Sequence, residues 1–530
     1  MHVRNASDDE RAWLHAYLSC PDVDAKHKAE YVAARVRAAY VSRGYDPDDP
    51  DDAAEIAASI ARNKPDDRLR QFDRKRSVFP TGLLPLVRKA APGKGFEVNE
   101  VDTREELPRV DLEGLDAEPM TLRPYQVDAV GSALVGPTSS SNVPSWTVEH
   151  ADPGRGIIWV PTGGGKSRMA VAIAHATPGV WLFMVHRSHL ADDVRNRWDT
   201  TAGVVEGCAA GLIGAGEWSE GRRFTCATLQ TLHAHLDTAR FRKLAESVTG
   251  VMVDEAHVAP AATFLEVIHR FERARFKIGM SGTPLARGDK KGQIAVGALG
   301  PVVYRVKAQH LIDRGYLTQP TIRVVPVLQD EYRDSWPETY EDLVVSSAHR
   351  NGAVAQCAIV CEKPGMVFVE SIEHGYRLLE FLRAHKLNCE FVYGDTSKHL
   401  RKRAVRELAR GDLDLLIATR VFNEGVDIPC LRAVVMAAAG RSEIAALQRV
   451  GRALRVEDGK AAATIYEIGD KGNVGLNDQA KDRLRAYQRE GYPIVVDRDI
   501  WPEAANPTRE LHRAWEAMLV SRELRRGGCA

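Results

Sequence analysis

Short apolar segments and helix-like segments alternate along most of the chain. The alternation runs from Leu122 to about Tyr304, and it returns from Gly365 to Gly469. Strands that alternate with helices are typical of parallel sheets covered by helices on both faces. We therefore expect an α/β fold with two parallel-sheet domains in tandem. The expected strands are Gly156–Val160, Val180–Val185, Arg223–Ala227, Gly250–Val253 and Phe276–Met280, followed by Met366–Glu370, Cys389–Tyr393, Asp414–Ala418, Ala433–Ala437 and Ala463–Ile468.

The two ends of the chain differ from this alternating region. Residues 1–65 carry apolar positions at helical spacing, which predicts a helical N-terminal extension. Residues 66–118 hold a basic cluster before Phe79–Leu84 and predict a small α+β accessory domain. The basic cluster suits either a solvated surface or a contact with phosphates. Residues 476–530 predict a charged helical tail. The two sheet domains are expected at 119–323 and 351–475, joined by a linker at 324–350.

The composition is ordinary for a folded protein of several domains. The chain has 530 residues, of which 44% are hydrophobic and 27% are charged. Lys and Arg together number 72, as do Asp and Glu, so the formal net charge is zero. This balance excludes a strongly basic, histone-like mode of nucleic-acid binding. It is compatible with a local basic groove.

The lengths of the apolar segments and the number of cysteines both indicate the cellular compartment of the protein. The first residues contain no apolar core of signal-peptide length, and every apolar run is far shorter than the ~20 residues of a membrane span. Eight cysteines in 530 residues do not form a disulfide framework. Cys357 and Cys361 share one face of an expected helix, and buried thiols are favoured there over a zinc site. We expect a cytoplasmic protein that makes no contact with a membrane.

A glycine-rich loop follows the first expected strand. Its sequence is Pro161-Thr162-Gly163-Gly164-Gly165-Lys166-Ser167, and a helix-like segment comes next. Strand, glycine loop and helix in this order are the context of a phosphate-binding loop, because glycines let backbone N–H groups turn toward phosphate oxygens. Lys166 can then reach the β- and γ-phosphates, and Ser167 can ligate Mg²⁺. Val160 occupies the position at which the strict motif has glycine.

Two carboxylates follow another buried strand of the same domain. Asp254 and Glu255 come directly after the apolar run Gly250–Val253. Ligands of parallel α/β sheets bind at the carboxyl ends of the strands, so both side chains are expected near the glycine loop. Asp254 can hold Mg²⁺, and Glu255 can orient an attacking water and accept its proton.

Three arginines share one face of an expected helix in the second domain. Arg449, Arg452 and Arg455 are spaced three residues apart. A solvated basic face is the ordinary interpretation of such a pattern. Gly451, however, interrupts the helix at a cost of ~1 kcal/mol, which favours a packing or ligand role. A guanidinium group directed at a γ-phosphate stabilises the charge of the transition state.

These motifs, in this order, resemble those of the superfamily 2 helicases of the DEAD/DEAH-box class. The literal box Asp254-Glu255-Ala256-His257 carries the resemblance, which covers about residues 119–470. It implies two RecA-like domains that bind ATP and Mg²⁺ and hydrolyse ATP. Residues Arg74–Leu84 resemble the small damage-recognition-like domain that precedes the motor in XPB-type and phage branch-migration helicases. That second resemblance favours DNA over RNA.

The resemblance also implies roles for individual residues. Nucleotide binding falls to Arg123, Gln126, Thr162, Gly163, Gly164, Gly165, Lys166, Ser167, Gly425 and Asp427, and Mg²⁺ binding to Ser167 and Asp254. Catalysis falls to Lys166, Asp254, Glu255, Gln448, Arg452 and Arg455. Contacts with the nucleic-acid backbone fall to His186, Arg187, Thr228, Gly394 and Thr419, and coupling between ATP and strand to His257, Ser281 and Thr283.

The sequence as a whole predicts an ATP-dependent DNA helicase or translocase. Its partner would be single-stranded, duplex or branched DNA, and a monomer is compatible with the motifs. Three alternatives stay open: an RNA helicase, the motor subunit of a restriction-type nuclease complex, and a nucleotide-binding scaffold without chemistry. The direction of movement and the oligomeric state are not predicted.

Overall fold

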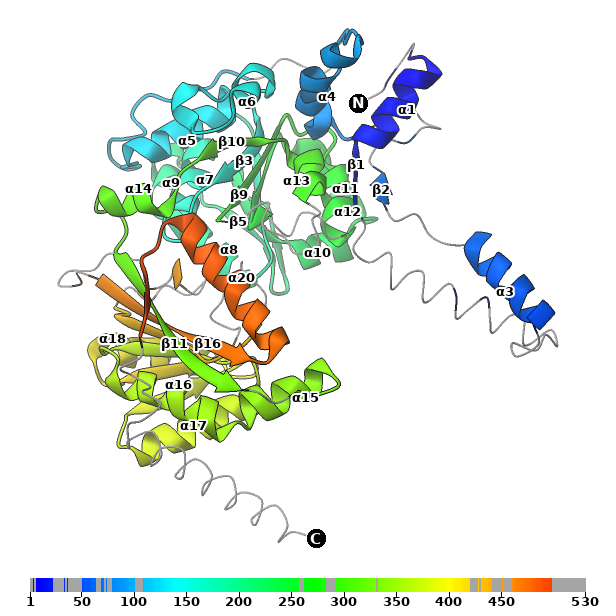
Figure 1. Cartoon of the computed structure of the whole chain (residues 1–530). Coiled ribbons are helices and arrows are strands. Elements are labelled where there is room, and N and C mark those ends of the chain that lie inside the picture. The colour runs from blue at the N-terminus through cyan, green and yellow to red at the C-terminus, as the bar shows by residue number, and fades with distance from the viewer. Residues whose placement is uncertain are drawn as a thin grey trace. The chain divides into compact units, whose positions relative to one another are not determined.

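The structure is a computed structural model of the 530-residue chain (Figure 1). The chain divides into two compact units, residues 1–159 with 166–305, and residues 160–165 with 306–530. The structure describes residues 3, 6–21, 33, 36, 50–62, 68–70, 73, 79–100, 108–256, 262–282, 292–329, 332–419, 428, 430–440, 450–451, 453, 460 and 462–497.

The sheet of the first unit has the strand order β10-β3-β9-β8-β4-β7-β5-β6. Its neighbouring strands are parallel except β5 and β6, which are antiparallel. All five predicted strands are present, because runs that are buried on both faces read as continuous apolar segments. The strands are β3 (Arg155–Trp159), β4 (Trp181–Val185), β5 (Gly211–Gly214), β6 (Glu217–Ser219), β7 (Phe224–Thr228), β8 (Gly250–Asp254), β9 (Phe276–Ser281) and β10 (Val302–Arg305).

Helices cover both faces of this sheet, with α5 and α7 on one side and α11, α12 and α13 on the other (Figure 1). Ile157 and Val251 form a buried core with Phe264 and other residues of the second helix layer. On the opposite face Trp198 stacks on Phe224, with ring centroids 4.8 Å apart. The helices are α5 (Pro124–Leu134), η3 (Ser139–Ser141), α6 (Ser145–His150), α7 (Lys166–His175), α8 (Ser188–Thr200), α9 (Ala202–Glu206), α10 (Leu229–Ala234), α11 (Ala239–Ser247), α12 (Ala262–Arg270) and α13 (Gly292–Leu299).

A small N-terminal cluster packs against α13. Phe79 and Leu83 are buried in a core with Leu14, on which Val296 of α13 also packs. Gly82 permits the approach, because a Cβ atom there would lie 2.1 Å from the carbonyl oxygen of Val296. The segment around Gly82 therefore attaches the accessory residues to the first sheet domain. The elements described before residue 100 are α1 (Asp8–Tyr17), β1 (Ser19–Pro21), α3 (Pro50–Arg62), β2 (Arg68–Arg70), η1 (Thr81–Leu83), α4 (Leu84–Ala90) and η2 (Pro92–Lys94). Of these, α1, η1 and α4 contribute residues to this core.

Arg88 strengthens this attachment. Its guanidinium group donates two hydrogen bonds to Glu100, of 2.5 and 2.6 Å, and one of 2.7 Å to Asp152 Oδ1. A fourth bond, also 2.7 Å, reaches the carbonyl oxygen of His150. Both ion pairs hold the pKa of Arg88 above its usual range, although burial opposes them. Arg88 thus serves packing, whereas Arg74–Arg76 of the predicted basic cluster lie outside the described residues.

The sheet of the second unit is parallel throughout, in the order β13-β14-β12-β15-β16-β11-β17. The predicted linker needs correction here, because β11 pairs with β16 along its full length. Residues 324–329 therefore belong to the second sheet. The strands are β11 (Gln319–Gln329), β12 (Gly365–Phe368), β13 (Cys389–Val392), β14 (Leu415–Ala418), β15 (Ala433–Met436), β16 (Ala462–Gly472) and β17 (Ile494–Val496).

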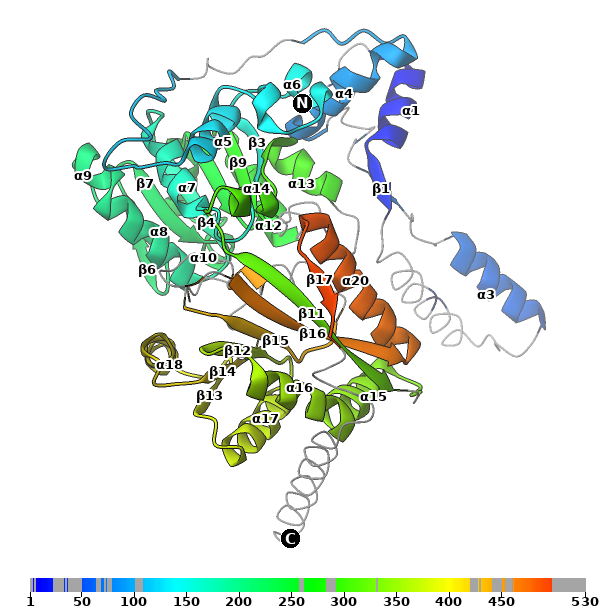
Figure 2. The same ribbon diagram turned by 60° about the vertical axis from the view of Figure 1, so that its left-hand side comes forward.

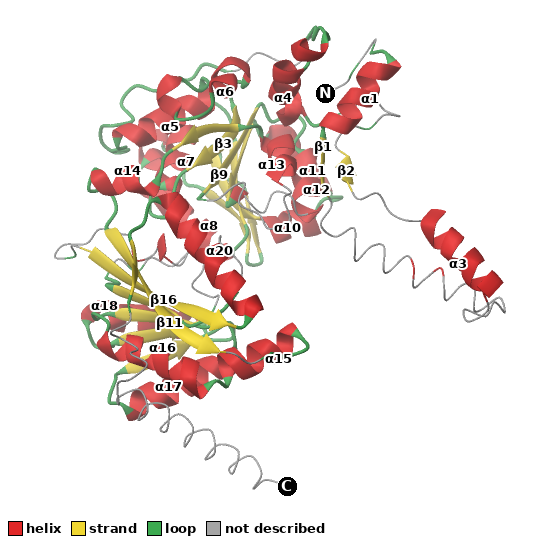
Figure 3. Ribbon diagram, in the orientation of Figure 1, coloured by secondary structure: helices red, strands yellow, loops and turns green. Residues whose placement is uncertain are grey.

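Helices also cover this second sheet, and α16 and α17 lie side by side on one face (Figure 2). Tyr466 and Ile468 of β16 face these two helices. Glu467 points the other way and binds α20, so residues 476–490, the start of the predicted helical tail, are helical and pack on the second sheet. Figure 3 shows the resulting mixture of helix and strand in each unit. The helices are α14 (Ala308–Asp313), α15 (Trp336–Tyr340), η5 (Glu341–Val345), α16 (Ala348–Val360), α17 (Ile372–Ala384), α18 (Lys398–Arg410) and α20 (Val474–Glu490).

None of the helices in the described part of the chain is both long and apolar enough to span a membrane.

Candidate functional site

The glycine loop leads directly from β3 into α7, which begins at Lys166. Gly163 and Gly165 have φ values of +87° and +82°, in the left-handed region that favours glycine. Gly164 has a different constraint, because a Cβ atom there would lie 2.3 Å from Val160 Cγ1. All three glycines are thus required by the backbone path. The N–H groups at the start of α7 remain available to bind an anion.

Lys166, Glu255 and Ser281 lie together at the carboxyl edge of the first sheet. The Lys166 Nζ atom is 3.8 Å from Glu255 Oε1, and both side chains are largely buried. Ser281 Oγ donates a 3.2 Å hydrogen bond to Glu255 Oε2. The three residues follow or end β3, β8 and β9, which are neighbours in the sheet. The structure therefore brings a predicted phosphate ligand, catalytic carboxylate and coupling hydroxyl into one cluster.

The turn after β8 holds the two carboxylates in different directions. Asp254 Oδ1 accepts a 3.0 Å hydrogen bond from the backbone N–H of Glu255. Glu255 itself has a φ of +53°, which costs a residue with a side chain of order 1 kcal/mol or more. Strain of this kind is concentrated at functional sites. The carboxylate of Asp254 and the hydroxyl of Ser167 are the hard oxygen donors that Mg²⁺ prefers, so these residues fit the metal.

Arg123 and Gln126 lie at the start of α5. Gln126 is 2% exposed, and its Oε1 accepts a 2.9 Å hydrogen bond from the backbone N–H of Arg123. Its amide group also donates to Tyr125 Oη at 3.3 Å. Gln126 therefore caps α5 in this structure. A contact with adenine would have to replace or add to these bonds.

The predicted nucleic-acid contacts of the first unit lie at two neighbouring strand ends. His186 and Arg187 follow β4, and Thr228 ends β7. Gln230 joins the two ends, because its Nε2 donates a 3.1 Å hydrogen bond to the carbonyl oxygen of His186. Gln230 lies two residues after Thr228 and was not among the predicted contacts.

Gly394 and Thr419 occupy equivalent places in the second unit. Gly394 lies in a tight turn after β13, closed by a 3.0 Å bond from the N–H of Thr396 to the carbonyl oxygen of Tyr393. Thr419 follows β14, and its N–H donates to the carbonyl oxygen of Val392 at 3.2 Å. The two predicted contacts therefore adjoin at the carboxyl edge of the sheet.

Several predicted residues lie outside the described part of the chain. Their placement relative to the cluster around Glu255 stays a prediction. They are His257, Thr283, Gly425, Asp427, Gln448, Arg452 and Arg455.

Two buried arginines hold the backbone that leads to the predicted catalytic arginines. Arg350 of α16 forms a two-bond ion pair with Asp470, of 2.9 and 3.2 Å, and donates a 2.6 Å bond to the carbonyl oxygen of Ala437. Arg483 of α20 pairs with Glu467 and donates a 2.8 Å bond to the carbonyl oxygen of Gly440. These four charged side chains are at most 3% exposed. Sequence alone does not indicate this role, because the burial of a charged side chain depends on its tertiary partners.

Cys357 and Cys361 lie in the core of the second unit. Burial raises the pKa of both thiols, which keeps them in the neutral form. Within the described residues, no three His, Cys, Asp or Glu side chains are grouped as metal ligands.

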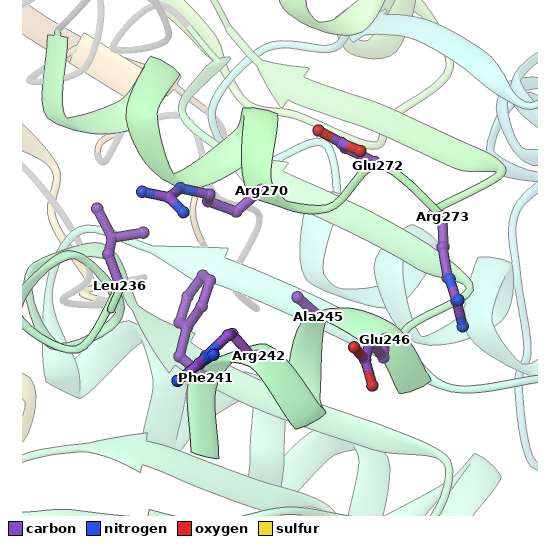
Figure 4. Close-up of a pocket in the computed structure, with 8 residues that line it drawn as sticks. All are labelled: Leu236, Phe241, Arg242, Ala245, Glu246, Arg270, Glu272 and Arg273. Atoms are coloured by element: carbon purple, nitrogen blue, oxygen red, sulfur yellow. The ribbon is translucent and has the colours of Figure 1, made fainter. Parts of the chain in front are cut away.

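A separate cavity of about 250 Å³ lies beside α11 and α12 in the first unit (Figure 4). Its end at Glu246 and Arg273 precedes β8 and β9, whereas the cluster around Glu255 follows them. The cavity therefore extends toward the opposite edge of the sheet and is not part of the candidate site. Its lining residues are Leu236, Phe241, Arg242, Ala245, Glu246, Arg270, Glu272 and Arg273.

The sequence matches two protein-family models and several known proteins. The family model described as type III restriction enzyme, res subunit, matches residues 119–286, and the helicase conserved C-terminal domain matches residues 355–457. The ATP-dependent DNA helicase uvsW of Enterobacteria phage T4 is 24% identical over 476 residues, which cover 81% of this chain and 90% of the phage protein. The DNA 3'-5' translocase XPB2 of Sulfurisphaera tokodaii is 24% identical over 392 residues, covering 66% and 82%.

Other relatives are longer, and the match spans 58% and 49% of two haloarchaeal proteins. Among solved structures, a fragment of the HsdR subunit of a type I restriction enzyme from Vibrio vulnificus has a TM-score of 0.51 at 19% identity. That likeness covers 82% of this chain and 76% of the fragment, and it shows the fold. With both family models matched in order and two tandem parallel-sheet units observed, the chain belongs to the superfamily 2 helicases, which hydrolyse ATP.

Proposed function

We propose that this chain is an ATP-dependent DNA motor that moves on, or remodels, duplex or branched DNA. The observation that supports this most strongly is the position of Glu255 between Lys166 and Ser281, beside a glycine loop. A phosphate loop, a carboxylate and a hydroxyl on one sheet edge are the parts that transfer of a phosphoryl group to water requires. The relatives named as a DNA helicase and a DNA translocase favour DNA as the partner.

The nucleotide binds along Thr162–Gly165, where backbone N–H groups of the loop and of the start of α7 donate hydrogen bonds to its phosphate oxygens. When the nucleotide binds, the ammonium group of Lys166 leaves its ion pair with Glu255 and pairs with the β- and γ-phosphate oxygens. The released carboxylate then orients the attacking water and accepts its proton. Arg123 and Gln126 contact the adenine.

Ser167 and Asp254 would hold Mg²⁺, which when bound neutralises charge between the β- and γ-phosphates. From the second domain, Gly425 and Asp427 contact the nucleotide. Gln448, Arg452 and Arg455 stabilise the charge that develops on the transferred group.

The nucleic-acid strand lies over the strand ends that carry the predicted backbone contacts. Contacts to phosphate and sugar carry no base sequence, so movement is independent of sequence and sensitive to salt. Ser281 couples ATP hydrolysis to strand binding, because it already donates a hydrogen bond to the carboxylate of Glu255. Thr283 and His257 complete this coupling. The predicted strand contacts are His186, Arg187, Thr228, Gly394 and Thr419.

The test is ATP hydrolysis by the full chain with equal nucleotide concentrations of single-stranded, forked, branched and duplex DNA and of RNA. We expect DNA to stimulate hydrolysis and branched or duplex forms to do so most strongly. Equal stimulation by RNA would contradict the choice of DNA. Hydrolysis that no nucleic acid stimulates would contradict the motor.

A second candidate is the motor subunit of a restriction-type complex. The description of the first family model and the HsdR fragment favour it. Incubation of circular duplex DNA with ATP and Mg²⁺ separates the candidates, because only a nuclease complex linearises the circle.

A further inference from the structure

Three aromatic side chains meet at the edge strand of the second sheet. Tyr376 lies on α17, Phe391 lies in β13, and Tyr393 follows β13 directly. The ring centroid of Tyr376 is 5.1 Å from that of Phe391 and 5.8 Å from that of Tyr393, both edge to face. The two tyrosine hydroxyls are joined by a 3.1 Å hydrogen bond. Gly375 leaves room for the cluster, because a Cβ atom there would lie 2.2 Å from the Phe391 ring.

Tyr376 is the exposed member of this cluster. Its side chain is 39% exposed, whereas Phe391 packs against the core of the unit. The ring of Tyr376 is therefore held by its contacts with Phe391 and Tyr393 and is partly exposed to solvent. A preoriented aromatic ring loses little conformational entropy when a planar group stacks on it, and every nucleobase offers such a face.

The aromatic cluster adjoins the turn that carries the predicted backbone contacts of the second unit. Tyr393 begins this turn, and Gly394 is the next residue. The N–H of Tyr393 donates a 3.1 Å bond to Thr396 Oγ1, which fixes the ring relative to the turn. A strand that followed Gly394 with its phosphates would pass within reach of Tyr376.

A basic helix follows the same turn. Six of the thirteen residues of α18 are Lys or Arg, and one is acidic. Arg403 pairs with Glu390 and Glu407, but Lys402, Arg406 and Arg410 are exposed and form no ion pair with any described residue. Aromatic rings beside unpaired cations are the combination that binds single-stranded nucleic acid.

We propose that Tyr376, supported by Tyr393, stacks on a base of single-stranded DNA while Lys402 and its neighbours on α18 neutralise phosphates. This inference rests on the proposed function, because it names how the second unit binds the strand that the motor moves along. It adds a contact with bases to contacts that were otherwise assigned to phosphate and sugar alone.

The test compares a labelled DNA single strand with a strand of equal length whose central positions are abasic. Fluorescence anisotropy without ATP gives both affinities for the full chain. We expect the unmodified protein to prefer the strand with bases by about 5- to 100-fold, and Tyr376→Leu to lose that preference. Tyr376→Phe should keep it, because the ring remains. Tyr332→Leu is the matched control, since Tyr332 is 78% exposed in the same unit.

Salt separates the two parts of the proposal. Lys402→Gln should lower the slope of log affinity against log salt by about 0.7, whereas Tyr376→Leu should leave the slope unchanged. A Tyr376→Leu protein that still prefers the strand with bases would overturn the inference. The exposed ring of Tyr376 would then be assigned to a contact with another protein. If DNA stimulates hydrolysis but no preference for bases exists, this inference fails alone; if nothing stimulates hydrolysis, the proposed function fails.

Discussion

Lys166 and Glu255 form an ion pair of 3.8 Å at the end of the glycine loop. The ammonium group of Lys166 and the carboxylate of Glu255 are therefore each other's partner. In the proposed function, a triphosphate replaces Glu255 as the partner of Lys166. In the proposed function, binding of the nucleotide therefore also releases Glu255 to act as the general base. This arrangement would limit the activation of water when no substrate is present.

Lys166→Ala should abolish ATP hydrolysis, by at least about 100-fold, because the variant lacks the cation that contacts the β- and γ-phosphates. The fold should persist, which circular dichroism can check. Release of inorganic phosphate in the presence of DNA measures the loss. Lys243→Ala removes an exposed lysine from α11 and is the control. Turnover of Lys166→Ala close to that of the control would refute the assigned role.

Glu255→Gln should lower turnover by about 100- to 10,000-fold, because an amide cannot accept the proton of the attacking water. Affinity for the nucleotide should stay equal or rise, since Lys166 no longer has to leave a carboxylate. Titration with a fluorescent ATP analogue measures this affinity beside kcat. A variant that bound nucleotide weakly and turned over normally would show that Glu255 holds the substrate instead.

Arg452→Ala should lower kcat by about 1,000-fold or more with little change in nucleotide affinity, because an arginine finger acts on the charge of the transition state. The matched control is Arg432→Ala, which removes a surface ion pair with Glu362 in the same unit. The comparison requires kcat and affinity from the same preparations. Loss of affinity with normal kcat would contradict a role in the transition state.

Gly82→Ala should destabilise the first unit by about 1–3 kcal/mol, because the new methyl group would overlap the backbone of α13. Gly93→Ala, in the same accessory segment, meets no atom within 4 Å and should change stability by less than about 0.5 kcal/mol. Urea denaturation followed by tryptophan fluorescence compares the two variants. Equal stabilities would mean that α13 and the accessory segment do not pack as described.

The stability of the second unit should fall as the pH is lowered from 7 to 5. Burial, with Arg350 and Arg377 nearby, lowers the pKa of His374 to about 3. The folded protein therefore binds no proton there between about pH 6.5 and 3, whereas the unfolded chain does, so stability is full above pH 6.5 and is lost below it. The expected loss by pH 5 is about 2 kcal/mol.

His374→Gln should reduce this pH dependence, which denaturation at both pH values can measure. His399→Gln changes an exposed histidine of α18 and should keep the dependence of the unmodified protein. An unaltered pH dependence in His374→Gln would assign the effect to other groups.

The sequence predicted ten strands of the two sheets, because buried strands of parallel sheets are continuous apolar runs. It missed β11, whose Pro320 and Pro326 argue against a strand inside a sheet. The structure explains the exception: β17 pairs only with Ile322–Val324 of β11, so both prolines lie where that side of the strand has no partner. Such an exception depends on a contact about 170 residues away along the chain, which local pattern cannot reveal.

The residues of the candidate site also fall into two groups, those that sequence motifs predict and those that depend on tertiary contacts. Lys166, Glu255 and Ser281 were predicted from motifs, since each motif ends a strand and parallel strands end at one edge. The buried pairs of Arg350 and Arg483 were not predictable, because burial of a charge depends on tertiary partners and not on local pattern. Tyr376 was missed for the same reason: its neighbours Phe391 and Tyr393 belong to another element.

The carbonyl groups of Ala437 and Gly440 have a mechanical consequence. Each accepts a hydrogen bond from a buried guanidinium group, one on α16 and one on α20. The backbone just before residue 441 is therefore fixed to both helices. A displacement of this backbone would act on both hydrogen bonds, and through them on α16 and α20.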